Sequence, residues 1–337
     1  MDQEKKSKIK RILFTTLRLV IAFALLGWLI MRIRIDKLQE LDLTNILISL
    51  AAAILLMSLQ VSSGAWRWKL LLGAQGIDMP LHRAILLSFQ GTAFSLFMPG
   101  GALGGDVIKA AILAAETKSG KRVEGITTVA LDRLIGMSAL FILVLIIALV
   151  GFRKIMEISI TVRAGIFALL LFCFIGILIV GALFFQDFVF RFAFMNRLRK
   201  KADILLKGKL SRILDAIALY RKERKVLLKA FLISILMVHP FLLSTMFVLL
   251  WGIESSCPAF LGSYLAIALG NSAAVIPMTP GGLGARDKIA QIVLISFGFN
   301  ELSATLAPLC FSLTLIAVGL IGLICFALDS FRKQQTT

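Results

Sequence analysis

The sequence predicts an all-α polytopic membrane protein, with about six spanning helices and two broken or re-entrant helix pairs in an inverted-repeat arrangement. Three observations predict this fold class. Hydrophobic residues make up 59% of the 337 residues and the mean hydropathy is +0.93, far more than the core of a water-soluble domain requires. Several runs without Asp, Glu, Lys or Arg approach the roughly 20 residues that cross a bilayer. Two further apolar regions are each interrupted by a Pro-Gly-Gly element.

Six segments are predicted to span the membrane as helices. They are residues 12–31, 43–64, 126–151, 164–185, 226–251 and 302–328. The first of them follows a charged start and lacks a small-residue cleavage site, so we expect it to be retained rather than removed as a signal peptide. We expect one transmembrane domain over residues 1–337, with the tail 1–11, the basic loop 186–229 and the tail 329–337 in the cytoplasm.

The distribution of Lys and Arg predicts the orientation of the chain. There are 37 Lys and Arg against 19 Asp and Glu, a net charge of +18. If both termini are cytoplasmic, the most basic connections are cytoplasmic too, including 13 Lys and Arg between Arg191 and Lys229. We expect that loop to lie on anionic head groups as amphipathic helix. Nucleic-acid binding is disfavoured because the basic residues are not interleaved with aromatic ones.

The two Pro-Gly-Gly elements repeat one another. Residues 99–108 read PGGALGGDVI and residues 280–289 read PGGLGARDKI, so Pro-Gly-Gly, Leu-Gly, Asp and Ile recur in the same order. Proline lacks a backbone donor and glycine adopts positive φ, so each element should end one helix and turn sharply into the next. Residues 84–98 form a helix of only about 22 Å, too short for a hydrocarbon core of roughly 30 Å, whereas residues 259–276 could just span alone. Under the predicted topology the first broken pair enters from the cytoplasm and the second from outside.

Corresponding broken segments in two halves of a chain are typical of a transporter's binding site. The amides that begin the helix after each break form a positive dipole end, which suits a phosphate or a carboxylate. Lys109, Arg286 and Lys288 add full charges near these ends. Asp106 and Asp287 could instead only cap their helices, and the two breaks could be packing kinks without a ligand. These alternatives stay open.

An acid and a base, Asp132 and Arg133, lie near the start of an otherwise apolar helix. Ionisable residues within a membrane are costly and usually face a partner or a cavity. Either Arg133 contacts a lipid phosphate or pairs with Asp106, or the two neighbours form a pair at the interface. We interpret the sequence WRW at residues 66–68 as an anchor in the interfacial aromatic belt, and His239-Pro240 as a helix kink.

The sequence gives no sign of metal, cofactor or nucleotide chemistry. The four cysteines lack CxxC or zinc spacing, and the chain has only two histidines, so no metal site and no cofactor are expected. No GxxxxGK[ST] motif is present, so we expect no use of ATP by this chain. No catalytic residue is predicted.

Three stretches, FMPGGALGGDVIKAAILA, TTVALDRLIG and IPMTPGGLGARDKIA, resemble in this order the lysylphosphatidylglycerol synthase transmembrane-region family, a flippase-like domain. The resemblance covers almost the whole chain and includes both glycine runs, Asp106 and the Asp132-Arg133 pair. It implies a domain in the prokaryotic inner membrane that moves lipids between leaflets, alone or beside a lipid synthase or glycosyltransferase. Members often carry Glu where this chain has Asp287. No soluble aminoacyl-transferase domain follows residue 328, so we expect no synthase activity.

Three functions remain open on the sequence. The first is a lipid translocator acting on anionic or phosphate-bearing membrane lipids, which we favour. The second is a transferase on a lipid carrier, with Asp106, Asp132 and Asp287 as its available carboxylates. The third is a non-catalytic partner of a lipid synthase or glycosyltransferase. The residues expected at the substrate site are Pro99, Gly100, Gly101, Gly104, Gly105, Asp106, Lys109, Asp132, Arg133, Pro280, Gly281, Gly282, Gly284, Arg286 and Asp287.

Overall fold

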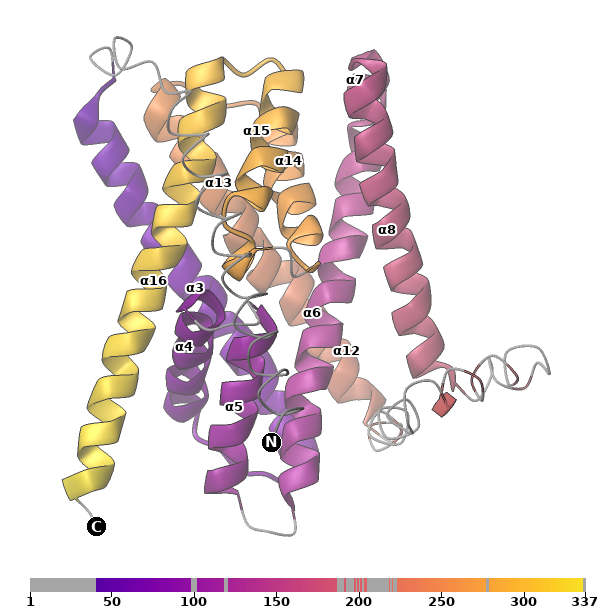
Figure 1. Cartoon of the computed structure of the whole chain (residues 1–337), viewed down its shortest axis with the longest axis vertical. Helices are drawn as coiled ribbons and strands as arrows, with labels where there is room; N and C mark the ends of the chain where they lie inside the picture. Colours follow the sequence, from indigo (N-terminus) through magenta and orange to yellow (C-terminus); the bar gives the residue numbers. More distant parts are fainter. Residues whose placement is uncertain are drawn as a thin grey trace, which may run out of the picture.

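The computed structural model is a bundle of long and half-length helices (Figure 1). It describes residues 41–97, 102–117, 121–186, 223–276 and 279–335, and between 187 and 222 the single residues 191, 197, 199, 201, 203, 204, 218 and 220. Every element among these residues is helical, which confirms the predicted all-α class. The predicted span 12–31 and the break residues Pro99, Gly100 and Gly101 lie outside the described residues.

Five described helices are long and apolar enough to cross a membrane, and they match the five remaining predicted spans. They are α3 (Leu43–Ala74), α6 (Arg122–Val150), α8 (Ile160–Phe184), the continuous stretch from α12 (Arg224–Ile233) to α13 (His239–Glu254), and α16 (Glu301–Gln335). A short helix, α7 (Phe152–Glu157), joins α6 to α8.

The observed helices differ from the predicted ones mainly at their ends. Helix α3 continues ten residues beyond the predicted end at Gly64, because a single glycine inside a helix costs only about 1 kcal/mol. Helix α6 begins at Arg122 rather than at residue 126, which places its charged residues one turn deeper than predicted. Helix α16 extends to Gln335, into the segment predicted as a tail.

Two pairs of half-length helices enter the bundle from opposite ends. The first hairpin consists of α4 (Leu81–Phe97) and α5 (Ala102–Glu116) and occupies the lower half of Figure 1. The second consists of α14 (Phe260–Ala273), the 3₁₀ turn η3 (Pro280–Gly282) and α15 (Ala285–Ser296), and occupies the upper half. With 14 residues, α14 is about 21 Å long, which is shorter than a hydrocarbon core of roughly 30 Å.

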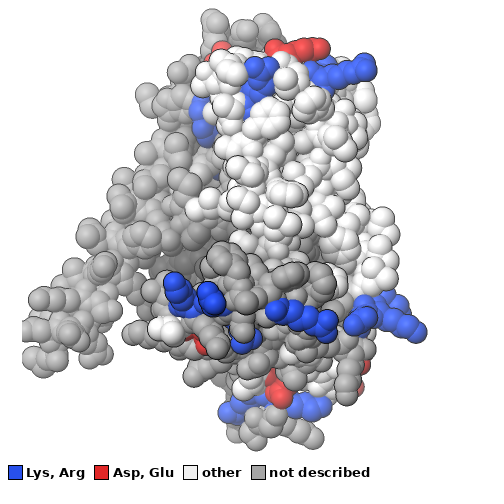
Figure 2. All heavy atoms as spheres, turned by 90° about the vertical axis from the view of Figure 1, so that its right-hand side faces the viewer, with Lys and Arg blue, Asp and Glu red and all other residues white. Residues whose placement is uncertain are grey.

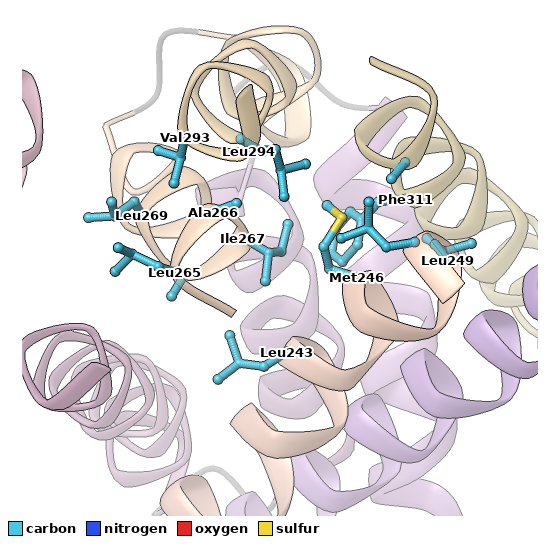
Figure 3. Close-up of a cluster of buried hydrophobic side chains, with 14 of the residues drawn as sticks. Leu243, Met246, Leu249, Leu265, Ala266, Ile267, Leu269, Val293, Leu294 and Phe311 are labelled. Carbon is cyan, nitrogen blue, oxygen red and sulfur yellow. The ribbon is translucent and has the colours of Figure 1, made fainter. Parts of the chain in front are cut away.

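The largest apolar core fixes the second hairpin in the bundle. Figure 3 shows buried side chains of α13, α14, α15 and α16 meeting in one cluster. Met246 from α13, Ile267 from α14, Leu294 from α15 and Phe311 from α16 are each at most 1% exposed. Tight packing of this kind makes the hairpin a rigid part of the bundle.

The last helix, α16, packs against both hairpins. Its approach to α4 is very close, since a Cβ added at Gly322 would lie 2.1 Å from the carbonyl oxygen of Phe89. At the lower end Arg83 of α4 donates to Asp329 of α16 at 2.8 Å and also pairs with Glu116 of α5. Helix α16 therefore connects the outer end of the first hairpin with the second hairpin.

The α12–α13 stretch contains one irregular turn. Residues Ser234–Val238 form a π-helical turn, η2, in which the His239 N–H donates to the Ser234 carbonyl five residues earlier. Pro240 follows directly and has no N–H to donate. The irregularity predicted at His239-Pro240 is thus a π-bulge in the turn before it, a feature often found at functional sites.

The visible face in Figure 2 carries Lys and Arg side chains at two levels, with described residues that are uncharged between them. This view faces the side of α7 and α8. The apolar residues of α8 are largely exposed there, including Leu171, Leu178 and Ile179 at 56–58%. An apolar band between two charged levels is the surface that a bilayer covers.

Candidate substrate-binding site

The second break has the geometry that its glycines predict. Gly281, Gly282 and Gly284 have φ values of +59°, +76° and +77°, a region that residues with a side chain rarely adopt. Pro280 begins the 3₁₀ turn. The chain therefore reverses direction at this element, and α15 begins just beyond it at Ala285.

The second break lies against the end of the helix that leads into the first break. Turn η3 packs on α4, and a Cβ added at Gly281 would lie 2.7 Å from Cδ2 of Leu96. Helix α4 ends one residue later, at Phe97. The inner end of α4 and the second break, which we call the hairpin tips, thus meet inside the bundle.

The first hairpin is held by a close approach of its two helices. A Cβ at Gly105 of α5 would lie 2.0 Å from the carbonyl oxygen of Gly91 and 2.1 Å from Oγ of Ser95, both on α4. Gly104 and Gly105 both fall within the first turn of α5 rather than in the break itself. Gly105 therefore serves helix packing, a role that its place in a glycine run did not indicate.

An ion pair joins this hairpin to α6. Arg133 donates from Nε to Oδ2 of Asp106 at 2.7 Å, and its Nη2 lies 2.7 Å from the same oxygen. The side chains are 39% and 28% exposed, more than those of the pairs Arg67–Asp132 and Arg286–Asp287. One of the alternatives left by the sequence, the pairing of Arg133 with Asp106, is therefore present.

Asp132 faces a different helix from its neighbour Arg133. Its Oδ1 accepts a hydrogen bond at 2.7 Å from Nε of Arg67 on α3, while Nη1 of Arg67 donates to Oγ of Ser234 at 2.8 Å. The Arg67 and Asp132 side chains are 8% and 14% exposed. Because α6 begins at Arg122, these charges lie about 15 Å from the start of the helix, and each pairs with a residue of another helix rather than with its neighbour.

Lys109 lies over the face of Trp68, with its Nζ 3.7 Å from the ring centroid. Trp68 is fully buried and donates from Nε1 to Oγ1 of Thr128 at 2.9 Å. The interpretation of residues 66–68 as an interfacial anchor is therefore wrong for Arg67 and Trp68, which face the protein interior. Trp66, at 41% exposure, is the member of the three that faces outward.

A glycine of α6, Gly136, leaves room for the Arg67 guanidinium. A Cβ at Gly136 would lie 3.1 Å from Nη1 of Arg67. The Gly136 carbonyl oxygen lies 2.9 Å from Nε2 of His239, whose Nδ1 is buried without a partner. The π-bulge, Gly136 and Ser234 thus together shape the pocket of protein atoms that holds this arginine.

We call Arg67, Asp106, Lys109, Asp132 and Arg133 the charge cluster. Its members come from α3, α5 and α6, and Lys109 interacts electrostatically with the other four. The sequence singled out every member except Arg67. A helical reading of α3 could have found Arg67, because Ser63, Arg67 and Leu71 recur at a spacing of four and share a buried face.

Arg286 and Asp287, which follow the second break, are hydrogen-bonded to each other. Arg286 donates from Nε to Asp287 at 3.1 Å and from Nη2 to Oγ of Ser312 at 2.5 Å, and its guanidinium lies 4.7 Å from the Phe311 ring centroid. Asp287 also accepts from the Gly284 N–H at 3.0 Å, which is the capping role left open by the sequence. Both side chains are at most 2% exposed. Both residues bond to Ser312, so they hold the second break against α16.

Several buried polar atoms of α4 and of the segment before the second break lack a partner. The amide Oε1 and Nε2 of Gln90 on α4 and the hydroxyl of Thr279, next to the second break, are buried without a hydrogen bond. Asn271 and Ser272, in contrast, bond back to carbonyls of their own helix. In the part of the chain that the structure describes, no group of His, Cys, Asp and Glu is arranged to hold a metal ion.

The fold and the site define an integral membrane protein of the polytopic all-α class, in which two opposed helix hairpins meet beside buried charges. The chain matches the model of the family described as the lysylphosphatidylglycerol synthase TM region over residues 15–322, and it belongs to that family. A comparison with curated proteins found no match. Family membership relates the chain to lipid modification or transport.

Proposed function

We propose that this protein translocates a phosphate-bearing lipid, or a lipid-linked precursor, between the leaflets of a membrane. The observation that carries the proposal is the meeting of the two hairpin tips, where Gly281 contacts Leu96, in a bundle that also buries a charge cluster. A symmetric pair of broken helices offers one site to both sides of the membrane in turn.

In this proposal both hairpins are re-entrant, and the chain is an inverted repeat. Helices α4, α5, α14 and α15 have 12–17 residues, about 18–26 Å, which is less than a hydrocarbon core of roughly 30 Å. Non-helical backbone at membrane depth is tolerated only where it is buried in protein or lines a water-filled cavity. We place such a polar cavity between the hairpin tips, with the acyl chains remaining in the bilayer.

The head group would contact the first hairpin and α6. Arg133 and Lys109 supply positive charge, and the amides that begin α5 and α15 supply partial positive charge. The Arg133 side chain is 39% exposed, so it can exchange Asp106 for a phosphate. Pro99, Gly100, Gly101 and Gly282 would allow close approach of backbone to ligand.

We place the protein in the inner membrane of a prokaryote with both termini in the cytoplasm. The basic connection between α8 and α12, with 13 Lys and Arg from Arg191 to Lys229, supports this orientation. Its partners would be membrane lipids, and a lipid synthase or glycosyltransferase could supply or consume the substrate. We propose no nucleic-acid role.

The transferase alternative has less support from the geometry. Asp106 and Asp132 pair with arginines of other helices, and Asp287 is bonded by Arg286, Ser312 and the Gly284 N–H. None of the three carboxylates is thus a free base aimed at a substrate. Turnover of a lipid-linked substrate by the purified protein alone would favour this alternative.

A vesicle assay tests the proposal directly. The purified protein is reconstituted into vesicles that contain fluorescent phospholipids, and the fraction of probe that reaches the outer leaflet is followed by chemical quenching. We expect lipid movement with the wild type and a loss of at least about tenfold with Arg133→Ala, equivalent to about 1.4 kcal/mol. Arg153→Ala, at an exposed position of α7, should retain the wild-type rate. Absence of movement for phospholipids and for polyprenyl-linked sugars would contradict the proposal.

A further inference from the structure

The charge cluster contains one more cation than carboxylate. Arg67, Lys109 and Arg133 carry three positive charges, and Asp106 and Asp132 carry two negative ones. Two of the cations have a carboxylate of their own, since Arg67 pairs with Asp132 and Arg133 pairs with Asp106. The third, Lys109, has no carboxylate oxygen within ion-pair distance among the residues that the structure describes.

The environment of Lys109 indicates that its amine is charged and held in place. The residue is 7% exposed, and its Nζ lies 3.7 Å from the centroid of the Trp68 ring. The face of an indole attracts an ammonium ion but offers little to a neutral amine. The stem of Lys109 lies beside Gly91, where an added Cβ would be 3.8 Å from two of its carbons. Trp68 is itself fixed by its hydrogen bond to Thr128.

An excess positive charge inside the protein is costly, so the charge cluster favours an anionic ligand. Asp106 lies one turn before Lys109 on the same face of α5, and its partner Arg133 is 39% exposed. A phosphate that reaches Arg133 therefore also comes near Lys109. One phosphodiester charge would bring the cluster to neutrality. A zwitterionic head group carries its own cation, so it would leave the excess positive charge of the cluster uncompensated.

We infer that the charge cluster selects head groups with one net negative charge, a phosphodiester without a compensating amine, and that Lys109 is the residue that sets this selectivity. The inference rests on the proposed lipid translocation and adds to it the charge class of the substrate.

The test compares the rates of two lipids that differ in head-group charge. Vesicles contain fluorescent phosphatidylglycerol, which is anionic, or fluorescent phosphatidylcholine, which is zwitterionic, and the ratio of their rates is the readout. We expect the wild type to favour phosphatidylglycerol by roughly tenfold, and Lys109→Gln to reduce the ratio to near one. Because a ratio is measured, partial loss of folded protein does not affect it. Lys109→Arg should keep most of the preference, and Lys154→Gln, an exposed lysine of α7, should keep all of it.

A second measurement separates a lipid head group from free phosphate. The melting temperature of the protein in detergent is recorded with short-chain phosphatidylglycerol, with short-chain phosphatidylcholine or with inorganic phosphate. Only the first should raise it, and Lys109→Gln should abolish the rise. An equal rise with inorganic phosphate would overturn the inference in favour of an ion site.

The outcomes distinguish this inference from the proposed function. If the wild type moves lipids at rates independent of head-group charge, or if Lys109→Gln leaves the ratio unchanged, the selectivity inference is wrong while translocation stands. If the wild type moves neither phospholipid and no polyprenyl-linked sugar, the proposed function fails, and the inference fails with it.

Discussion

At the residue scale, Arg67 stabilises the bundle by compensating the buried charge of Asp132. The pair is joined at 2.7 Å with both side chains at most 14% exposed. We predict that Arg67→Met destabilises the protein by about 3–5 kcal/mol, because it leaves a buried carboxylate without its cation. Thermal or denaturant unfolding in detergent measures this loss.

A double-mutant cycle separates the ion pair from simple packing loss. Asp132→Asn removes the charge that Arg67 compensates. The double variant should therefore lose about 1–3 kcal/mol less stability than the sum of the losses of the two single variants. Strictly additive losses would mean that the two side chains do not interact, contrary to their hydrogen bond.

The sequence reveals charged residues but not their partners. Asp132 and Arg133 stood out because they interrupt an apolar run, and the pairing of Arg133 with Asp106 was one of two possibilities. Arg67 was missed because tryptophans on both sides are typical of an interfacial belt. Its partner lies 65 residues away, and only the packing of α3 on α6 brings them together. Local pattern cannot specify that contact.

At the element scale, the first hairpin depends on close contact between α4 and α5. A Cβ at Gly105 would lie 2.0 Å from a backbone oxygen of α4, so Gly105→Ala forces the helices apart. We predict a loss of stability of about 1–3 kcal/mol or more, measured as thermal unfolding in detergent. Gly181→Ala on α8, where no atom lies within 4 Å of the added Cβ, is the matched control. It should be neutral or stabilise by up to about 1 kcal/mol.

The contact between the hairpin tips gives a second prediction. Gly281→Ala adds left-handed backbone strain of about 1–2 kcal/mol and a clash with Leu96 at 2.7 Å. Leu96→Ala removes the clashing atoms, so the double variant should be more stable than the summed single losses predict, by about 1 kcal/mol or more.

Gly298→Ala is the control for this cycle. Its φ is +91°, but nothing lies within 4 Å of the added Cβ, so it imposes strain without a clash. Combined with Leu96→Ala, it should give additive losses. Coupling of Leu96 to both glycines alike would show that the cycle reports backbone strain rather than contact between the tips.

Helix existence was easier to predict than helix ends. Charge-free length identified every described span, and the repeated Pro-Gly-Gly identified both hairpins, because proline and glycine act locally on the backbone. The extension of α3 to Ala74 was not predicted, since tertiary packing overrides the local signal of Gly64. The same extension carries Arg67 into the interior, so an error in one helix end hid one site residue.

At the scale of the whole molecule, α16 relates the two hairpins to each other. Its first half holds the second hairpin through Ser312 and Phe311, which contact Arg286. Its second half holds the first hairpin through Gly322 and through the pair of Asp329 with Arg83. A motion that alternates access to the hairpin tips must therefore slide or tilt at least one hairpin along this helix.

The opposed entry of the hairpins predicts which connections share a side of the membrane. The connection between α13 and α14 contains the exposed Cys257, and it lies at the opposite end of the bundle from the connection between α3 and α4 (Figure 1). With basic connections in the cytoplasm, Cys257 faces outward and the exposed Asp78 faces inward. The other cysteines are buried or half-buried within helices, so they should react poorly with a charged reagent.

Membrane vesicles of known orientation test this arrangement. A membrane-impermeant maleimide should label the wild type in right-side-out vesicles, and Cys257→Ser should abolish that label. In the Cys257→Ser background, Asp78→Cys should be labelled only in inside-out vesicles. The α3–α4 connection leads into the first hairpin, and the α13–α14 connection leads into the second. Labelling of both positions from one side would therefore show that the two hairpins do not enter from opposite faces. Labelling of each position from the side opposite to that predicted would keep the hairpins opposed but reverse the molecule, and would place the charge cluster nearer the outer leaflet.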